Sequence, residues 1–111
     1  MDTLNTYRVI IEKVLNEYAQ IPYSYGEIER EIVFDRDHDR YLLLSVGWEG
    51  RRRVHGALIH IDVIHDKVWI QGDNTEDGIA NDLVAAGIPK ESIVLGFHSL
   101  DIRKHTEFAV A

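Results

Sequence analysis

The chain has 111 residues, of which 45% are hydrophobic and 28% are charged, the composition of one ordinary globular domain. It contains no cysteine, which excludes disulfides, thiolate metal sites and cysteine nucleophiles from these residues. Nineteen acidic and twelve basic residues give a formal net charge of −7, and a field of that sign disfavours general binding to nucleic acid. We therefore expect a single domain over residues 1–111.

Two further features of the sequence bear on where the protein works. The opening residues lack the basic start and the apolar stretch of a secretory signal peptide. No apolar run approaches the roughly 18–20 residues that a helix needs to cross a bilayer. We therefore expect a cytoplasmic protein that has no membrane partner.

The N-terminal region carries a helical pattern. Its apolar residues recur at intervals of three and four positions and form one stripe: Leu4, Tyr7, Ile11, Val14, Leu15 and Tyr18. Asp2 or Thr3 can cap the start of such a helix, and Pro22 cannot continue it. The pattern predicts a helix over residues 3–20.

From Glu27 onward the hydrophobic period changes to two, which is typical of half-buried strands. The alternation predicts strands over residues 27–35, 41–48, 53–65 and 68–71, separated by short polar turns. Short connections between consecutive strands are typical of antiparallel hairpins. The sequence therefore predicts a four-stranded antiparallel meander.

A second helix is predicted to begin at Asn74 or Thr75 and to end at Gly87. Residues 93–97 are expected to form a short buried strand or extended segment, whereas the pattern of residues 98–111 assigns no element. The fold class is therefore α+β. It consists of the meander with the N-terminal helix and the second helix on one face, plus the short C-terminal strand or extended segment.

The sheet face away from the helices is predicted to be half apolar. By alternation it carries Tyr41, Leu43, Ser45, His60, Asp62 and Trp69. A surface of this kind is typical of a subunit or partner contact, and Tyr41, Leu43 and Trp69 would anchor a homodimer or larger assembly. In the alternative interpretation, the C-terminal tail folds over this face.

His60 and Asp62 lie two residues apart on one side of a predicted strand. The spacing suits two metal ligands, or a base with the acid that orients it. Either site needs a third ligand or a nucleophile, and Ser45 is a neighbour only if the strand register brings it there. Because a surface histidine–carboxylate pair has the same spacing, we predict no catalytic residue, no metal and no cofactor, with His60 and Asp62 as the alternative metal pair.

Arg51, Arg52 and Arg53 form the one basic cluster of the sequence and fall in a predicted hairpin turn. Three guanidinium groups can hold phosphates or the carboxylates of a partner. Because the whole chain is acidic, a solubilising turn is the simpler interpretation, and we expect no direct nucleic-acid binding by the isolated chain. The sequence contains no phosphate-binding loop, no G-x-S-x-G and no H-E-x-x-H.

The C-terminal half contains a long and specific string. Residues 77–98 read DGIANDLVAAGIPKESIVLGFH, and they are followed by Arg103 and by TEFAV at residues 106–110. These residues resemble the signature of the XisI-like family. Further matches lie in the N-terminal helix and in Asp37-x-x-Arg40-Tyr41-Leu42-Leu43, Gly47-Trp48, His60, Asp62 and Lys67-Val68-Trp69-Ile70-Gln71. The resemblance covers essentially the whole chain.

The XisI-like family comprises fdxN element excision controlling factors, which are mostly cyanobacterial. Its founding member is required, together with a protein named XisH, for site-specific excision of a DNA element during heterocyst differentiation, and a separate recombinase exchanges the strands. The resemblance therefore implies an accessory factor that acts through contacts with a XisH-like protein. It brings no assigned catalytic residue. An acidic chain without a nucleophile or phosphate loop fits a regulator better than a recombinase.

The segment after the predicted short strand crowds five ionisable groups into ten residues: His98, Asp101, Arg103, His105 and Glu107. Binding groups often lie on such loops, and Arg103 can hold a partner carboxylate, which makes His98, Arg103 and Glu107 partner-binding candidates. In the alternative interpretation, Arg103 and Glu107 clamp the tail internally. The competing function is a small metal-dependent enzyme or nuclease component that uses His60, Asp62, His98 and Glu107.

Overall fold

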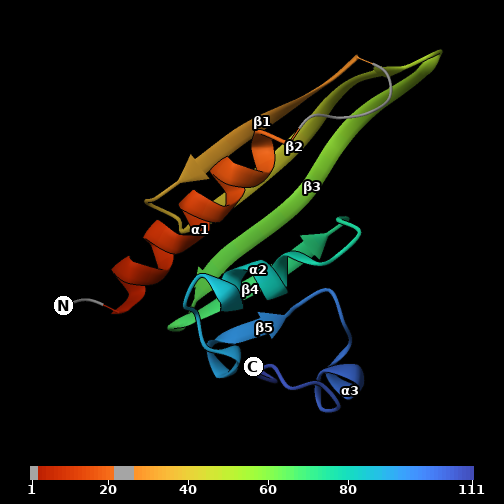
Figure 1. Ribbon diagram of the computed structural model, residues 1–111. Coiled ribbons are helices and arrows are strands. Elements are labelled where there is room, and N and C mark those ends of the chain that lie inside the picture. Colours follow the sequence, from red (N-terminus) through yellow and green to blue (C-terminus); the bar gives the residue numbers. More distant parts are fainter. Residues whose placement is uncertain (1–2, 22–26) are drawn as a thin grey trace.

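The computed structural model describes residues 3–21 and 27–111. The helices in this part are α1 (Thr3–Ala19), α2 (Ile79–Ala85) and α3 (Leu100–Arg103), and a 3-10 turn covers Lys90–Ser92. The strands are β1 (Glu27–Asp35), β2 (Arg40–Glu49), β3 (Arg52–Ile64), β4 (Lys67–Asp73) and β5 (Ile93–Leu95). Figure 1 shows α1 and α2 on the same side of the sheet, with the far ends of β1, β2 and β3 extending beyond them.

The five strands form one sheet in sequence order, β1-β2-β3-β4-β5. The first four strands are antiparallel to their neighbours, and β5 pairs with β4 in parallel. The predicted α+β class and antiparallel meander are therefore confirmed, with β5 as the short C-terminal strand. None of the described helices is long and apolar enough to cross a membrane.

The predicted apolar stripe of α1 faces the sheet. Its buried residues are Tyr7, Ile11, Val14 and Leu15. The buried side chains of the three central strands lie in the same core: Tyr41, Leu43, Ile59, Ile61, Val68 and Ile70. Burying one such aliphatic side chain contributes about 1.5–3 kcal/mol. This shared core determines which face of the sheet the helix covers.

α2 begins at Ile79, later than predicted. The carboxylate of Asp73 explains the difference, since it accepts hydrogen bonds from the backbone N–H groups of Thr75 at 2.9 Å and of Ile79 at 2.7 Å. Residues 74–78 therefore form a turn around this carboxylate instead of a first helical turn.

The predicted end of α2 is confirmed. Gly87 has a φ of 121°, a backbone conformation that residues other than glycine rarely adopt. The backbone N–H of Ile88 then donates to the carbonyl of Leu83 at 3.0 Å, and the Ile88 side chain is fully buried. This ending directs the chain toward β5.

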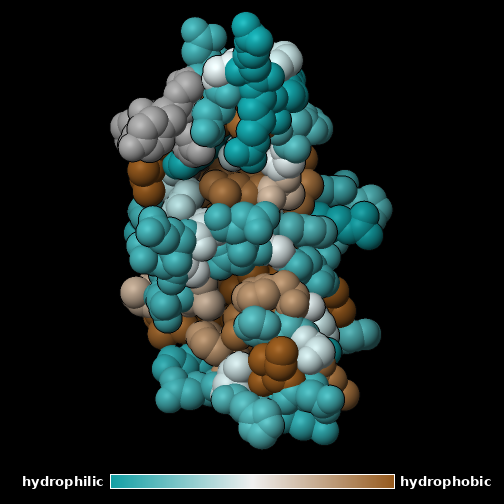
Figure 2. All heavy atoms as spheres, turned by 90° about the vertical axis from the view of Figure 1, so that its right-hand side faces the viewer, coloured by the Kyte–Doolittle hydropathy of each residue, from teal (hydrophilic) through white to brown (hydrophobic). Residues whose placement is uncertain are grey.

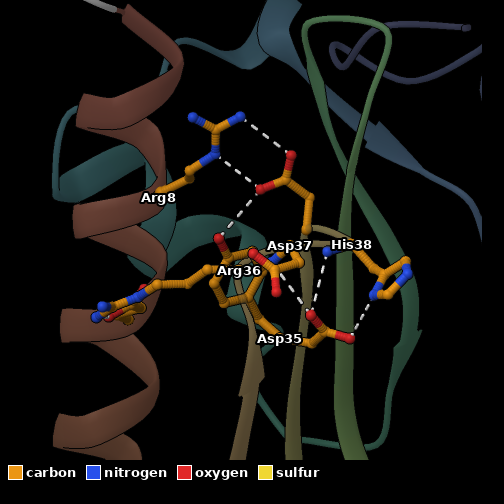
Figure 3. A network of polar contacts seen from close by, with 8 residues as sticks. Arg8, Asp35, Arg36, Asp37 and His38 are labelled. Carbon is orange, nitrogen blue, oxygen red and sulfur yellow. Dashed lines mark hydrogen bonds and ion pairs between the residues drawn. The ribbon is translucent and has the colours of Figure 1, made fainter.

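Arginine–carboxylate pairs fix the turn between β1 and β2 to α1 (Figure 3). Arg8 donates from Nε and Nη2 to the two carboxylate oxygens of Asp39 at 2.7 and 3.0 Å. Arg36 makes the same two-point contact with Glu12 at 2.8 and 2.6 Å. The hydroxyl of Tyr41 donates to Asp39 at 3.2 Å, and burial, together with this neighbouring carboxylate, raises the pKa of Tyr41 to about 12.

A β-bulge changes which residues of β3 face the helices. Leu43 pairs with Ile59 whereas Leu44 pairs with Ala57, so Leu58 is the extra residue. Ala57 therefore leaves the face that carries Ile59 and is exposed on the opposite one. A second register shift follows in the pairing of β3 with β4.

Candidate interaction surface

Two residues that were predicted to lie on the sheet face away from the helices lie in the core. Tyr41 and Leu43 are 0% exposed, and their partners on β3 are Ile61 and Ile59, under α1. The prediction that Tyr41 and Leu43 anchor an interface is therefore wrong, and Ser45 shares their face by alternation. Both faces of β2 are apolar, so alternation alone does not decide which one the helix covers.

Trp69 lies on the opposite face, where its backbone partners are Asp62 and Val94. The guanidinium of Arg103 lies over the indole ring, 5.4 Å from the ring centroid, and its Nη1 donates to the carbonyl of Val110 at 2.8 Å. Val94 is fully buried on this side. The C-terminal tail therefore covers the part of the face that belongs to β4 and β5.

Two further contacts hold the C-terminal tail in place. Within the described residues, Glu107 pairs with the ammonium group of Lys90 and not with Arg103, and this hydrogen bond lowers the pKa of the Glu107 carboxyl. The backbone N–H of Ala109 donates to the carbonyl of Ile93 at 2.8 Å. The tail is thus clamped internally, but through different pairs from the predicted one.

Large apolar side chains remain exposed along this clamped segment. Phe97, Leu100, Ile102 and Val110 are 44%, 49%, 51% and 38% exposed, and we call them the C-terminal apolar residues. His98 is half-buried, with its ring centroid 4.4 Å from that of Phe97. Figure 2 shows hydrophobic side chains at the surface of the lower part of the molecule, where α3 and the C-terminus lie in Figure 1.

His60 and Asp62 contact each other, with 2.9 Å between Nε2 and Oδ1. Gln71 donates to the other oxygen of Asp62 at 3.4 Å. Ser45 pairs with Gly56 across the strands. It is therefore not beside His60, where a serine nucleophile activated by that histidine would have to lie. Among the described residues, no three histidine, cysteine, aspartate or glutamate side chains are grouped so that they could hold a metal ion.

The predicted basic cluster lies at the turn between β2 and β3. Arg51, Arg52 and Arg53 are all exposed, and Figure 1 shows this turn beyond the helices. The guanidinium of Arg53 lies 5.1 Å from the ring centroid of Trp48, and its Nη1 donates to the carbonyl of Gly47 at 3.4 Å. Arg53 is therefore held beside an exposed tryptophan.

The face of β1, β2 and β3 opposite α1 carries one column of side chains per strand, and we call it the open face. The column on β1 is mainly acidic, that on β2 is apolar apart from Arg40 at one end, and that on β3 contains arginine, histidine and, at the same end as Arg40, Asp62. In strand order the columns are Glu27, Glu29, Glu31, Val33 and Asp35; Trp48, Val46, Leu44, Leu42 and Arg40; and Arg53, His55, Ala57, His60 and Asp62. Val33 and Trp48 are 43% and 49% exposed, and a shallow depression of about 550 Å³ lies among Glu27, Glu29, Val46 and Arg53.

Sequence reasoning missed Leu100, Ile102 and the β2 column of the open face. Leu100 and Ile102 are apolar residues in a stretch that is otherwise mainly polar and charged, with no helical or strand period to place them in a core. That mismatch is the signal that could have identified them as exposed.

The chain is similar to one described family and to solved structures. The sequence profile of the family described as XisI protein matches residues 1–110. A XisI-like protein from Anabaena variabilis ATCC 29413 is 33% identical, with a TM-score of 0.88 over 98% of this chain and 100% of that one. The fdxN element excision controlling factor XisI from the same organism is 34% identical, with a TM-score of 0.83 over 99% and 100% of the two chains. A search of curated proteins found no match. The chain belongs to the XisI family.

Proposed function

We propose that this protein is a non-enzymatic accessory factor that controls the excision of a DNA element, and that it acts in the cytoplasm by binding a XisH-like protein. Membership of the XisI family supports the excision role, as does the similarity to a relative described as an fdxN element excision controlling factor. The formal charge of −7 favours action through a protein partner over direct contact with DNA.

The proposed contact surface consists of the C-terminal apolar residues, and their exposure is the observation on which this choice rests. The C-terminal apolar residues are exposed on a segment whose backbone is held in place by Arg103, Lys90 and the hydrogen bond from Ala109. Exposed apolar side chains on a fixed backbone are typical of protein interaction sites, because little conformational entropy is lost on binding. His98 lies beside this surface. Arg103 and Glu107 hold the segment in place and are not proposed to contact the partner.

The test is co-expression of this chain with a XisH-like protein, followed by sizing chromatography at micromolar concentration. We expect the two proteins to elute together. Ile102→Glu places a charge at a position that is 51% exposed, so it should weaken binding by about tenfold or more, or about 1.4 kcal/mol, without lowering the melting temperature.

Lys104→Glu is the matched control, since it introduces the same carboxylate two residues away at an exposed position without removing an apolar side chain. It should bind as the wild type does. Separate elution of the two wild-type proteins would contradict the partner, and wild-type affinity of Ile102→Glu would contradict the surface. An excision reporter strain then tests the role, because Ile102→Glu should reduce excision while Lys104→Glu should not.

The competing function, a metal-dependent enzyme or nuclease component, has less support. Its four residues do not converge in the structure: His60 contacts Asp62, His98 contacts Phe97, and Glu107 contacts Lys90. Metal analysis of the purified protein, with and without His60→Ala, distinguishes this function from the accessory role.

A further inference from the structure

The open face combines three features that a solvated sheet face does not need. Its apolar column on β2 runs from Leu42 to Trp48, and Trp48 is 49% exposed. An acidic column lies on one side of it, and a column with Arg53 and His55 lies on the other. The ion pairs of the described residues include none of the three glutamates on β1. These carboxylates are therefore available to a partner surface.

We propose that the open face binds the open face of a second copy of this chain, in a homodimer whose two-fold axis runs parallel to β2. Rotation about such an axis turns one sheet over and places β1 of each copy above β3 of the other. Glu27 and Glu29 of each copy then face Arg53 and His55 of the other, and the two apolar columns meet at the centre.

The other simple arrangement is disfavoured by charge. A two-fold axis that lies in the face but runs across the strands would stack β1 on β1. The glutamates of one copy would then face the glutamates of the other, and like charges brought together at an interface repel one another. At the other end of the face the axis parallel to β2 also places two acids opposite each other, Asp35 and Asp62, but Arg40 lies on the strand between them. The glutamates on β1 and Arg53 on β3 therefore favour the axis parallel to β2.

The strand register makes this match specific. Rotation about an axis parallel to β2 keeps each residue at its level along the strands. Glu27 and Arg53 share one level because both pair with Trp48, and Glu29 and His55 share the next. Glu27 of each copy thus faces Arg53 of the other, where the guanidinium is already positioned over the Trp48 ring. The pair of Glu27 with Arg53 fixes how the two copies lie on each other along the strands.

Sedimentation velocity of the full chain tests the face. The wild-type protein is expected to sediment with twice the mass of one chain at micromolar concentration. Val46→Glu should give a single-chain mass while retaining the circular dichroism spectrum of the wild type. Because Val46 is half-buried, Trp48→Glu provides a second variant at a side chain that is 49% exposed. A single-chain mass for the wild type, or a dimer mass for both variants, would overturn the proposal.

A charge exchange tests the axis. Glu27→Arg and Arg53→Glu should each weaken the dimer by about tenfold or more, because each places like charges opposite one another. The double variant recreates both pairs in reverse and should restore most of the lost affinity. If the double variant is weaker than either single variant, the axis is wrong. Glu76→Arg, at an exposed position before α2, is the control and should dimerise normally.

This inference does not depend on the proposed function. The C-terminal apolar residues belong to the tail that follows β5, whereas the open face belongs to β1, β2 and β3. Ile102→Glu should therefore leave the dimer mass unchanged, and Val46→Glu should leave binding of the XisH-like protein intact at the C-terminal surface. Failure of one proposal is thus distinguishable from failure of the other.

Discussion

Replacement of Arg103 by lysine is expected to loosen the C-terminal tail. The guanidinium makes two contacts that join distant segments: it lies 5.4 Å from the centroid of Trp69 on β4, and Nη1 donates to the carbonyl of Val110 at 2.8 Å. Lysine keeps the positive charge, but it lacks the planar group that can lie on the indole and donate sideways at the same time. Arg103→Lys therefore tests the geometry of the contact and not its charge.

The magnitude follows from the two contacts. A stacked cation–π contact contributes about 0.5–1 kcal/mol, and a net hydrogen bond contributes about 0.5–1.5 kcal/mol. The Nε atom of Arg103 is buried without a hydrogen-bond partner among the described residues, which reduces the net gain. We therefore expect a loss of about 1–2 kcal/mol. For a domain of this size, a loss of about 1 kcal/mol lowers the melting temperature by roughly 4 °C or more.

Thermal unfolding followed by circular dichroism measures this loss. Lys104→Arg, the reverse exchange at the neighbouring exposed residue, is the control and should stay within about 0.5 kcal/mol of the wild type. Combining Arg103→Lys with Trp69→Leu in a double-mutant cycle isolates the stacking contribution. If Arg103→Lys melts at the wild-type temperature, the tail is not held by this contact, and its internal clamp must lie elsewhere.

Two further predictions concern the core and the loop before α2. The pKa of Tyr41 is raised from 10 to about 12, so the folded state holds the phenol proton more tightly; the stabilisation is complete below pH 10 and is lost as the pH rises through 12. Urea unfolding at several pH values should show this loss in the wild type and a smaller one in Tyr41→Phe, and identical pH dependence would contradict the assignment. Asp73→Ala should lower the free energy of unfolding, measured in urea, by about 0.5–2 kcal/mol, because it removes the acceptor for the N–H groups of Thr75 and Ile79. Asp77→Ala, in the same loop, is the control and should lower it by less. Equal losses in the two variants would refute the role of Asp73.

Local patterns in the sequence determined most of the elements of this protein. The stripe of α1 predicts the buried residues Tyr7, Ile11 and Leu15 because helical spacing puts them on one side whatever they pack against. The short polar turns predict the hairpins because so few residues can join only antiparallel neighbours. Gly87 predicts the end of α2 because its backbone conformation excludes most other residues.

Only the tertiary structure decided which side of each element is buried and which side is exposed. Both sides of β2 are apolar, so only the docking of α1 buries Tyr41 and Leu43 and leaves Leu44 and Val46 on the open face. The bulge at Leu58 shifts the register by one residue, and the alternation of apolar residues in the sequence does not predict it.

The contacts of the tail were also beyond local reasoning. Arg103 and Glu107 are four residues apart, which suggested a pair, yet each finds a partner in another part of the chain, at Trp69 and at Lys90. Tertiary packing supplies these two distant partners, and no feature of the local sequence indicates them. The two surfaces proposed for binding arise from such long-range packing, and for that reason only the three-dimensional arrangement could indicate them.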